Sequence, residues 1–310
     1  MEKKTLTIFT PAYNRAHTIG RTYESLCRQT SNDFCWLVVD DGSVDESLSA
    51  CEQYACQDKR IKVFHKEDKI PIRYIYQQNQ GMHGAHNTAY RNIDTELNTC
   101  IDSDDYMPDN AVEKIVSFWK KNGSEKYAGI IGLDVTENGN IIGNLFPQGL
   151  RTTTLEKYYR NGGKGDKKLI YRTDVINLTP EYPIFEGEKY VGLGYKYQLI
   201  DQRYELLILN EPLVVVEYQV DGSSMNMYKQ YWNNPRGFAF MRKNDMIYAP
   251  TLKRKFESCI HYVANSFRSR NKRMIKESPL RFLTCLAIFP GLFLYWFTKY
   301  KVRHNSLKSI

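Results

Sequence analysis

The sequence has few of the patterns that mark a protein held together by metals or disulfides. Its seven cysteines are odd in number and scattered, and no Cys-x-x-Cys or Cys/His spacing indicates a zinc site or a disulfide framework. Repeats and low-complexity tracts are also missing. The N-terminus passes directly into a strand-like Leu6–Phe9, without the long apolar segment of a signal peptide. We therefore expect a protein of a reducing cytosol.

The composition is that of a globular protein, but the charge is unevenly distributed. The 310 residues are 42% hydrophobic and 25% charged, which predicts a packed core in one large domain with additions or in two smaller domains. The formal net charge is +8, and many basic residues flank a late apolar run, Leu280–Phe297. Basic residues on both sides of an apolar run indicate a membrane surface as the partner, and no nucleic acid.

Polar loops follow three predicted strands in the first part of the chain. The pattern predicts a β-α-β unit and then two more strands with helices between them. Parallel strands connected by right-handed crossovers end at one edge of their sheet, where ligands of open α/β sheets bind. We therefore expect the loops after Thr10, Val39 and Ile101 to form one site. The predicted elements are the strands Leu6–Thr10, Phe34–Val39, Ile72–Tyr76 and Leu97–Ile101, and the helices Ile19–Leu26, Ser47–Tyr54 and the stretch ending near Asn92.

Three carboxylates follow the last of these strands, in Asp102-Ser-Asp-Asp105. Hard divalent cations take oxygen ligands, and Mg²⁺ is usually held by one or two carboxylates together with substrate phosphates. A second interpretation is that the turn only ends the strand and that Asp105 caps the helix expected near Pro108. The position of this turn as the last of three strand-end loops on one sheet edge favours the metal and nucleotide site.

Four segments in this order resemble the nucleotide-sugar half of family 2 glycosyltransferases. They are Thr10-Pro-Ala-Tyr-Asn-Arg15, Val39-Asp-Asp-Gly-Ser43, Asn79-Gln-Gly81 with Asn87, and Ile101-Asp-Ser-Asp-Asp105 with Pro108. The resemblance covers about the first 110 residues and implies the A-type glycosyltransferase fold, an α/β fold with a mostly parallel nucleotide-binding sheet and flanking helices. It implies Asp104 and Asp102 as ligands of Mn²⁺ or Mg²⁺. It also implies nucleotide-sugar contacts from Pro11, Tyr13, Asn14, Arg15, Asp40, Asp41, Gly81, Asn87, Asp102 and Ser103.

The second half of the predicted catalytic domain contains a candidate general base. Glu186 and Glu188 flank Gly187 ahead of a predicted helix through Arg203. Family 2 enzymes usually place an acidic residue, often the Asp of a Glu-Asp pair, at the start of such a helix, and this sequence departs from that pair. We favour Glu188 over Glu186, because Tyr190 then falls where an aromatic residue commonly follows. The other interpretation is that both acids only complement the helix dipole.

The remaining segments of this half have weaker patterns. Thr152–Asp174 is polar and rich in glycine, so we expect a loop on the acceptor side or an exposed connector. Two strands are expected at Glu205–Asn210 and Pro212–Tyr218.

The C-terminal part is predicted to be helical and to associate with a membrane. Leu252–Lys276 has one apolar side, and the eighteen residues Leu280–Phe297 are interrupted by Pro290-Gly291. We expect an interfacial anchor with basic flanks, and the alternative is a buried core helix. The predicted division is a catalytic domain over 1–220 (1–110 nucleotide-sugar half, 111–220 acceptor half), a helical extension over 221–278 and a membrane-associating tail over 279–310.

These features predict an inverting, metal-dependent glycosyltransferase at the cytoplasmic face of the cell membrane. The resemblance implies a nucleotide diphosphate sugar as donor, in the first place a UDP-sugar, and a glycan or lipid-linked acceptor in cell-surface polysaccharide synthesis. Two alternatives remain. A sugar nucleotidyltransferase should carry a triphosphate loop rich in glycine, Arg and Lys after its first strand, where this chain has Pro11–Arg15. A non-catalytic glycan- or membrane-binding protein would not need all three aspartates.

Overall fold

The computed structural model describes residues 3–45, 55–56, 61–64, 70–217 and 227–305. The chain forms two compact units, which we describe separately. The first comprises residues 1–181 and 196–218, and the second comprises residues 182–195 and 219–310. The segment 182–195, which contains both candidate bases, thus packs with the C-terminal helices.

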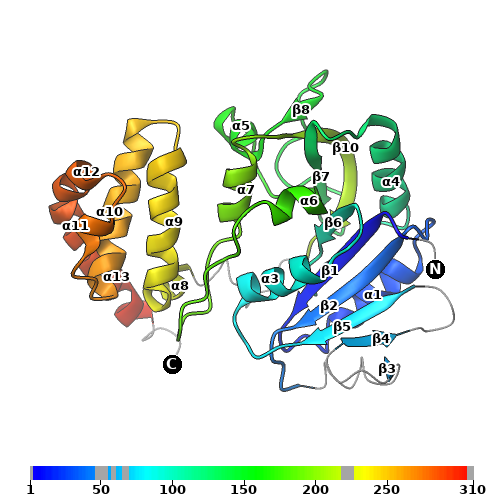
Figure 1. The fold of residues 1–310 in the computed structure, drawn as a ribbon, viewed down its shortest axis with the longest axis horizontal. Coiled ribbons are helices and arrows are strands. Elements are labelled where there is room, and N and C mark those ends of the chain that lie inside the picture. Colours follow the sequence, from blue (N-terminus) through cyan, green and yellow to red (C-terminus); the bar gives the residue numbers. More distant parts are fainter. Residues whose placement is uncertain (1–2, 46–54, 57–60, 65–69, 218–226, 306–310) are drawn as a thin grey trace. The chain divides into compact units, whose positions relative to one another are not determined.

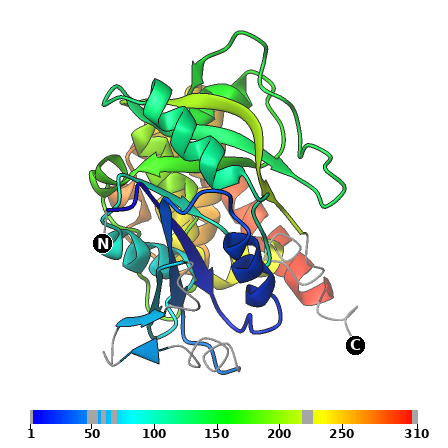
Figure 2. The same cartoon turned by 90° about the vertical axis from the view of Figure 1, so that its right-hand side faces the viewer.

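Among the described residues, the first unit is built on one sheet of ten strands with the order β3-β4-β5-β2-β1-β6-β9-β7-β10-β8 (Figure 1). The strands β3 and β4 lie at one end of this order, in light blue in Figures 1 and 2. The ten strands are β1 (Leu6–Ala12), β2 (Phe34–Asp40), β3 (Ala55–Cys56), β4 (Ile61–Phe64), β5 (Ile72–Tyr76), β6 (Leu97–Cys100), β7 (Tyr127–Val135), β8 (Thr152–Thr153), β9 (Lys167–Arg172) and β10 (Glu205–Val215).

The predicted parallel strands are confirmed. β1 pairs in parallel with β2 and β6, and β2 pairs in parallel with β5. β1 extends two residues beyond its predicted end, so that Pro11 belongs to the strand and pairs with Val39. The predicted helix Ser47–Tyr54 lies outside the described residues.

Helices and strands of this unit share one apolar core. Leu26 and Ile115 pack with Ile8, Val38 and other strand residues whose side chains are almost completely buried. The near-continuous apolar runs of β1 and β2 are typical of parallel strands that are covered on both faces. The helices concerned are α1 (Ile19–Cys27) and α4 (Ala111–Asn122), while α3 (Met82–Asn92) packs against β1 and β2.

The second half of the sheet differs from the prediction in two places. The expected loop Thr152–Asp174 instead contains two strands, β8 and β9, and the helix α5 (Leu155–Arg160), whose N-terminus is capped by the Thr154 hydroxyl. β9 lies antiparallel between β6 and β7. The two strands expected after Glu205 are one strand, β10, which pairs in parallel with β7 and has an irregular register around Pro212. Proline has no N–H for the ladder, so the strand shifts its register there without ending.

Two further short helices occur among the described residues, α6 (Thr173–Asn177) and α7 (Gly194–Ile200), and α7 belongs to the first unit from Lys196 onward. α7 contradicts the helix predicted from Glu188 through Arg203, because it begins six residues after Glu188. Glu188 therefore lies in a non-helical connection, directly after a turn at residues 186–187, and not at the N-terminus of that helix.

The second unit is helical in its described residues. The helix α10 packs against α9 and α13, and Met246, Cys259, Tyr262 and Val263 are buried between them. The predicted helix Leu252–Lys276 ends earlier, at Arg268, because Arg270 adopts a left-handed conformation with φ of 57°. The helices are α8 (Met227–Asn233), α9 (Pro235–Tyr248), α10 (Leu252–Arg268), α11 (Met274–Glu277), α12 (Arg281–Leu286) and α13 (Ile288–Asn305).

The late apolar run forms two helices that meet at Ala287. The predicted interruption at Pro290-Gly291 is wrong, because Pro290 occupies the first turn of α13, where a missing N–H costs no helical hydrogen bond. Within the described part of the chain, no helix has the length and apolar character needed to cross a bilayer.

Asp134 near the end of β7 gives a test of the fold. Its side chain is 5% exposed, and burial raises its pKa to about 6. The side chain of Asp in an unfolded chain has a pKa of ~4, so ionised Asp134 destabilises the native state fully above about pH 6 and not at all below about pH 4. We expect Asp134→Asn to raise the melting temperature by roughly 2–6 °C above pH 6, with no difference below pH 4.

Calorimetry across this pH range tests the prediction. Asp94→Asn is the matched control, because it removes the same charge at an exposed position and should leave the melting temperature nearly unchanged. A lower melting temperature for Asp134→Asn at neutral pH would contradict the prediction.

Candidate functional site

The carboxyl ends of six strands lie at one edge of the sheet. β5, β2, β1 and β6 are mutually parallel, β9 is antiparallel to β6 and β7, and β7 is parallel to β10. These relations place the ends of β5, β2, β1, β6, β7 and β10 together. We call this edge the carboxyl edge, defined by Ala12, Asp40, Tyr76, Asp102 and Val135. The expected convergence of the three polar loops is therefore confirmed.

Asp40 and Asp41 connect the loops of the carboxyl edge to one another. Asp40 is 1% exposed, and its carboxylate accepts hydrogen bonds from the Ser43 amide (2.7 Å) and from the Tyr74 hydroxyl. The Asp41 carboxylate accepts from the amides of Gln80 (2.8 Å) and Gly81 (2.7 Å). Asp41 therefore holds the loop that precedes α3 against the end of β2, and Asp40 fixes the loop after β2 and links it to β5.

Two glycines allow these loops to lie close together. Gly42 and Gly81 have φ values of 84° and 85°, and a Cβ on Gly42 would lie 2.8 Å from the Asn79 amide nitrogen. Gly81 thus contributes its backbone conformation and its N–H to the site.

The first loop presents an aromatic side chain. Tyr13 is 49% exposed, whereas Pro11 is half-buried in β1. Asn14 has a φ of 54°, donates its amide to the Ser43 hydroxyl (2.9 Å) and accepts from the Val44 amide (2.9 Å) through its side chain. The loops after β1 and β2 are therefore joined, and Tyr13 is left open to a ligand.

The acidic turn is fixed by its backbone. The Asp105 amide donates to the Asp102 carbonyl (3.0 Å), and the carbonyls of Asp104 and Asp105 accept from the Arg21 guanidinium (2.6 Å) and the Thr22 hydroxyl (2.7 Å). Asp102 is exposed, Asp104 is half-buried and Ser103 is buried. The turn therefore presents the carboxylates of Asp102 and Asp104.

Asp105 does not cap the next helix. Its side chain is buried and accepts from the Glu217 amide (3.1 Å), while the residue at the N-cap of α4 is Asn110. The interpretation of Asp105 as a helix cap is wrong, because its carboxylate instead attaches the turn to the segment that follows β10.

The negative charges of the acidic turn repel one another. Burial, followed by the negative charge of Asp102, raises the pKa of Asp104 and raises that of Asp105 to about 7. No cluster of three potential His, Cys, Asp or Glu ligands occurs among the residues that the structure describes. Two oxygen-bearing carboxylates next to excess negative charge nevertheless fit a Mg²⁺ or Mn²⁺ ion that takes its other ligands from phosphates and water. Asp104 and Asp102 would be its protein ligands.

Asn87 and the neighbouring histidines of α3 lie in the interior. Asn87 is 2% exposed and His86 is completely buried. The His86 ring packs edge-on against Phe9 at 5.0 Å, and burial lowers its pKa to about 4. These residues support the sheet beneath the loops.

Lys168 is a basic residue of the carboxyl edge that the sequence pattern did not reveal. It pairs with Gly132 and lies two residues before Ile170, which pairs with Thr99 near the end of β6. Its charge acts to lower the pKa values of Asp105 and Asp134, against the larger effect of their burial. Only the antiparallel insertion of β9 brings this lysine to the acids, so no local motif could have identified it.

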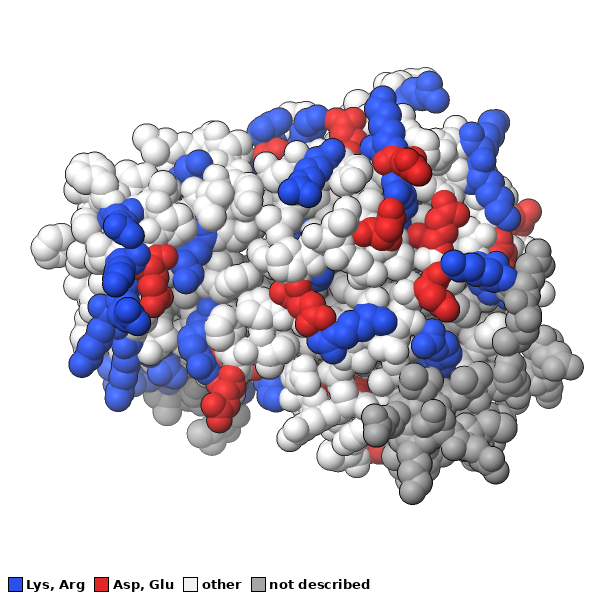
Figure 3. All heavy atoms as spheres, viewed as in Figure 1, with Lys and Arg blue, Asp and Glu red and all other residues white. Residues whose placement is uncertain are grey.

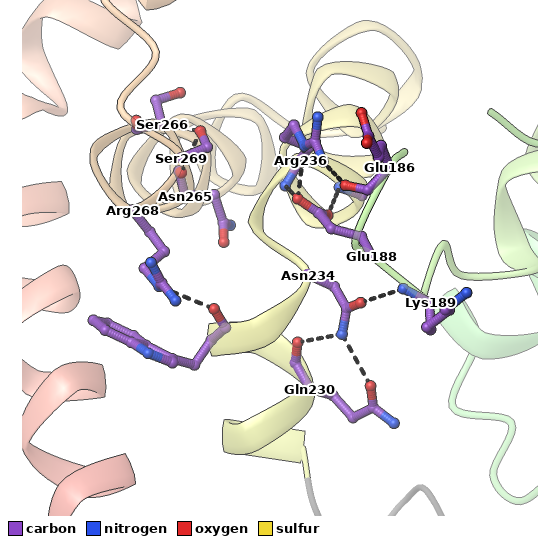
Figure 4. Close-up of polar contacts among 12 residues, drawn as sticks. Glu186, Glu188, Lys189, Gln230, Asn234, Arg236, Asn265, Ser266, Arg268 and Ser269 are labelled. Carbon is purple, nitrogen blue, oxygen red and sulfur yellow. Dashed lines mark hydrogen bonds and ion pairs between the residues drawn. The ribbon is translucent and has the colours of Figure 1, made fainter. Parts of the chain in front are cut away.

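The candidate bases belong to the second unit, where Glu188 is bonded to the start of α9 (Figure 4). Its Oε1 accepts from the Arg236 backbone amide (3.1 Å) and Nε (2.9 Å), and its Oε2 accepts from the Gly237 amide (2.9 Å). Pro235 supplies no N–H, so Glu188 satisfies the first two free N–H groups of α9. This geometry favours a structural role for Glu188.

Glu186 differs in its side chain. The carboxylate is exposed, and only its backbone carbonyl accepts from Arg236. The adjacent Lys189 amide donates to the Asn234 side chain (2.7 Å), which holds the same segment in place (Figure 4). Of the two acids, Glu186 has the carboxylate that is accessible to solvent.

A comparison of the sequence with models of protein families identifies the family to which this chain belongs. The model of glycosyl transferase family 2 matches residues 7–176, which include the carboxyl edge and the acidic turn. The chain belongs to glycosyltransferase family 2. This family 2 chain has the A-type glycosyltransferase fold predicted from its motifs.

Curated relatives agree with the family. The chain is 26% identical over 230 residues to UDP-Glc:alpha-D-GlcNAc-diphosphoundecaprenol beta-1,3-glucosyltransferase WfgD of Escherichia coli, covering 74% of this chain and 82% of WfgD. It is 32% identical over 139 residues to chondroitin synthase of E. coli, covering 45% of this chain but only 19% of that protein.

Solved structures share the fold. S. aureus TarS 1–349 in complex with UDP-GlcNAc has a TM-score of 0.57 at 16% identity, over 97% of this chain and 92% of the TarS 1–349 chain. The mannosyltransferase PcManGT from Pyrobaculum calidifontis, in complex with GDP-Man and Mn²⁺, has a TM-score of 0.54 at 13% identity, over 96% and 89% of the two chains.

We expect Lys168 to contribute to the binding of a nucleoside diphosphate. Replacing it with Met removes a positive charge near the acidic turn, so UDP binding measured by calorimetry with Mn²⁺ should weaken roughly tenfold, equivalent to about 1.4 kcal/mol. Lys164→Met is the matched control, because Lys164 is exposed and four residues away. Equal UDP affinities for the two variants would show that Lys168 does not contact the ligand.

Proposed function

We propose that the protein is an inverting glycosyltransferase that moves a sugar from a nucleotide diphosphate sugar to a hydroxyl group of a glycan or lipid-linked acceptor. The observation that carries the proposal is the pair Asp102 and Asp104, presented at the carboxyl edge next to the loops of Tyr13 and Asp40. Such a strand-end site is where open α/β sheets bind nucleotides. A UDP-sugar donor is supported by the names of WfgD and of the TarS complex.

The acceptor class is inferred from one relative. The WfgD name specifies a sugar linked to diphosphoundecaprenol as acceptor, and WfgD aligns over most of both chains. A lipid-linked acceptor in cell-surface polysaccharide synthesis, used at the cytoplasmic face of the membrane, is therefore part of the proposal.

The reaction breaks one bond and forms another. The acceptor oxygen attacks the anomeric carbon, the bond from that carbon to the diphosphate oxygen breaks, and the nucleoside diphosphate leaves with the bonding electrons. The acceptor proton passes to a carboxylate base. Tyr13 and the two loops held by Asp40 and by Asp41 orient the nucleotide, and Lys168 adds positive charge near the leaving diphosphate. A divalent cation held by Asp102 and Asp104 would supply Lewis-acid stabilisation of that leaving group.

Asp104→Ala tests the metal and donor site. We expect loss of Mn²⁺-dependent release of UDP from UDP-sugars, because one of two carboxylate ligands is missing, with little change in melting temperature. Asp109→Ala is the control, since Asp109 is a surface acid that pairs with Arg28. Full activity of Asp104→Ala would refute the assignment of Asp104 as a ligand.

The base stays a prediction, and the pair Glu188→Gln and Glu186→Gln tests it. The side-chain NH₂ group introduced by Glu188→Gln would oppose the N–H donors of α9, so we expect this substitution to destabilise the protein by about 1–2 kcal/mol. Glu186→Gln should leave stability unchanged. The variant that loses transfer but keeps donor binding and stability identifies the base. Loss of transfer by Glu188→Gln at unchanged melting temperature would contradict its structural role.

A further inference from the structure

The helices α12 and α13 expose a continuous row of large apolar side chains. The exposed fractions are 75% for Phe282, 84% for Phe289 and 74% for Phe293. Intervals of three, four or seven residues place the exposed members on α13 along one side of that helix, and the two members on α12 are four residues apart. We call this row the aromatic stripe; it consists of Phe282, Leu286, Phe289, Phe293, Trp296, Phe297 and Tyr300.

Small side chains, in contrast, face the interior of the unit. Ala287 and Thr284 are completely buried, and Thr298 is 3% exposed. A Cβ on Gly291 would lie 2.5 Å from the Val263 side chain of α10. The close approach of α13 to α10 at this glycine means that rotation of α13 to bury the stripe would break an existing contact.

An aromatic stack also holds α13 in this orientation. Trp232 of α8 stacks on Tyr295 at 5.6 Å, and the Arg268 guanidinium lies 4.4 Å from the Trp232 ring and donates to its carbonyl at 3.1 Å (Figure 4 shows Arg268). From Ile288 to Phe297, α13 is thus apolar on both sides, but only one of these sides is covered. Helices that are apolar all round are normally buried, so the stripe needs a second partner.

The charge around the stripe identifies the chemistry of that partner. Residues 252–310 contain thirteen Lys and Arg but only two acids, Glu257 and Glu277, whereas residues 1–251 contain more acids than bases. Lys299 lies 4.6 Å from the Trp296 ring, and Lys301 lies 5.7 Å from the Phe297 ring. Lys and Arg side chains gather over this unit on the face in Figure 3.

We propose that the aromatic stripe docks onto an anionic lipid bilayer, with α13 lying in the interface and not crossing it. The rings enter the boundary between headgroups and acyl chains, and Arg281, Lys299 and Lys301 contact lipid phosphates. A second copy of the chain would bring the same positive charge to the stripe, which disfavours self-association through it. This proposal does not depend on the proposed transfer reaction.

The experiment is co-sedimentation of the full chain with vesicles. The unmodified protein is expected to bind vesicles of phosphatidylcholine with phosphatidylglycerol, and to bind phosphatidylcholine vesicles more weakly. Phe289→Ser with Phe293→Ser should reduce the partition coefficient by roughly tenfold or more, because the transfer of two aromatic side chains out of water is lost. The melting temperature should not fall, since both side chains are exposed.

Matched variants separate the proposal from its competitors. Leu145→Ser with Leu178→Ser removes two exposed apolar side chains of the first unit and should leave vesicle binding unchanged. Lys299→Gln with Lys301→Gln should remove most of the preference for phosphatidylglycerol. UDP binding should be the same in all these variants, so a failure of the proposed function is detected separately.

Two results would overturn the proposal. The first is equal vesicle binding by the unmodified protein and the Phe289/Phe293 double variant, or no binding by either. The second is a dimer in sedimentation velocity that persists with vesicles present and that the double variant abolishes, because the stripe is then a contact between protein chains.

Discussion

The parallel pairing of β1 with both β2 and β6 is the constraint on which the site depends. It places Ala12, Asp40 and Asp102 at one edge, although some ninety residues separate the first from the last. Hydrogen bonds then add precision: Asp41 binds the loop before α3, and Arg21 and Thr22 of α1 bind the backbone of the acidic turn. A shift of this register by one residue would turn each side chain of the strand to the opposite face of the sheet, and the residues of the carboxyl edge would no longer lie together.

Carboxylates in the two units illustrate that similar motifs have different physical roles. Asp102 and Asp104 are presented beyond a strand end, and the charge of Asp102 helps to raise the pKa of Asp104, which suits a cationic ligand. Glu188 occupies an equally suggestive sequence position, yet its two oxygens are occupied by N–H groups of α9 and by the Arg236 guanidinium. A base must exchange a proton with an acceptor, and these hydrogen bonds would have to break first. Accessibility therefore distinguishes Glu186 from Glu188 better than motif position does.

Elements that depend on local sequence were predicted correctly, whereas features that depend on contacts between distant segments were not. The parallel strands and α3 follow from short apolar runs and turn residues, and the acidic turn follows from its own residues. Lys168 was missed, because its place depends on β9 entering between β6 and β7 in the opposite direction. The start of α7 at Gly194 and the capping of α9 by Glu188 depend equally on tertiary packing, which overrides local helix preference.

The formal charge of +8 is the sum over two regions with different electrostatics, the acidic carboxyl edge and the basic surroundings of the aromatic stripe. At the carboxyl edge, Asp102 and Asp104 alone would repel a diphosphate, so binding of a nucleotide requires added positive charge. Lys168 provides a single fixed charge, and a divalent cation would provide two while sharing its ligands with the phosphates. Around the aromatic stripe no acid follows Glu277 in the sequence, so attraction to an anionic surface needs no ion. The first attraction would therefore depend on the identity of the cation, and the second on ionic strength, because salt screens charges at an exposed surface.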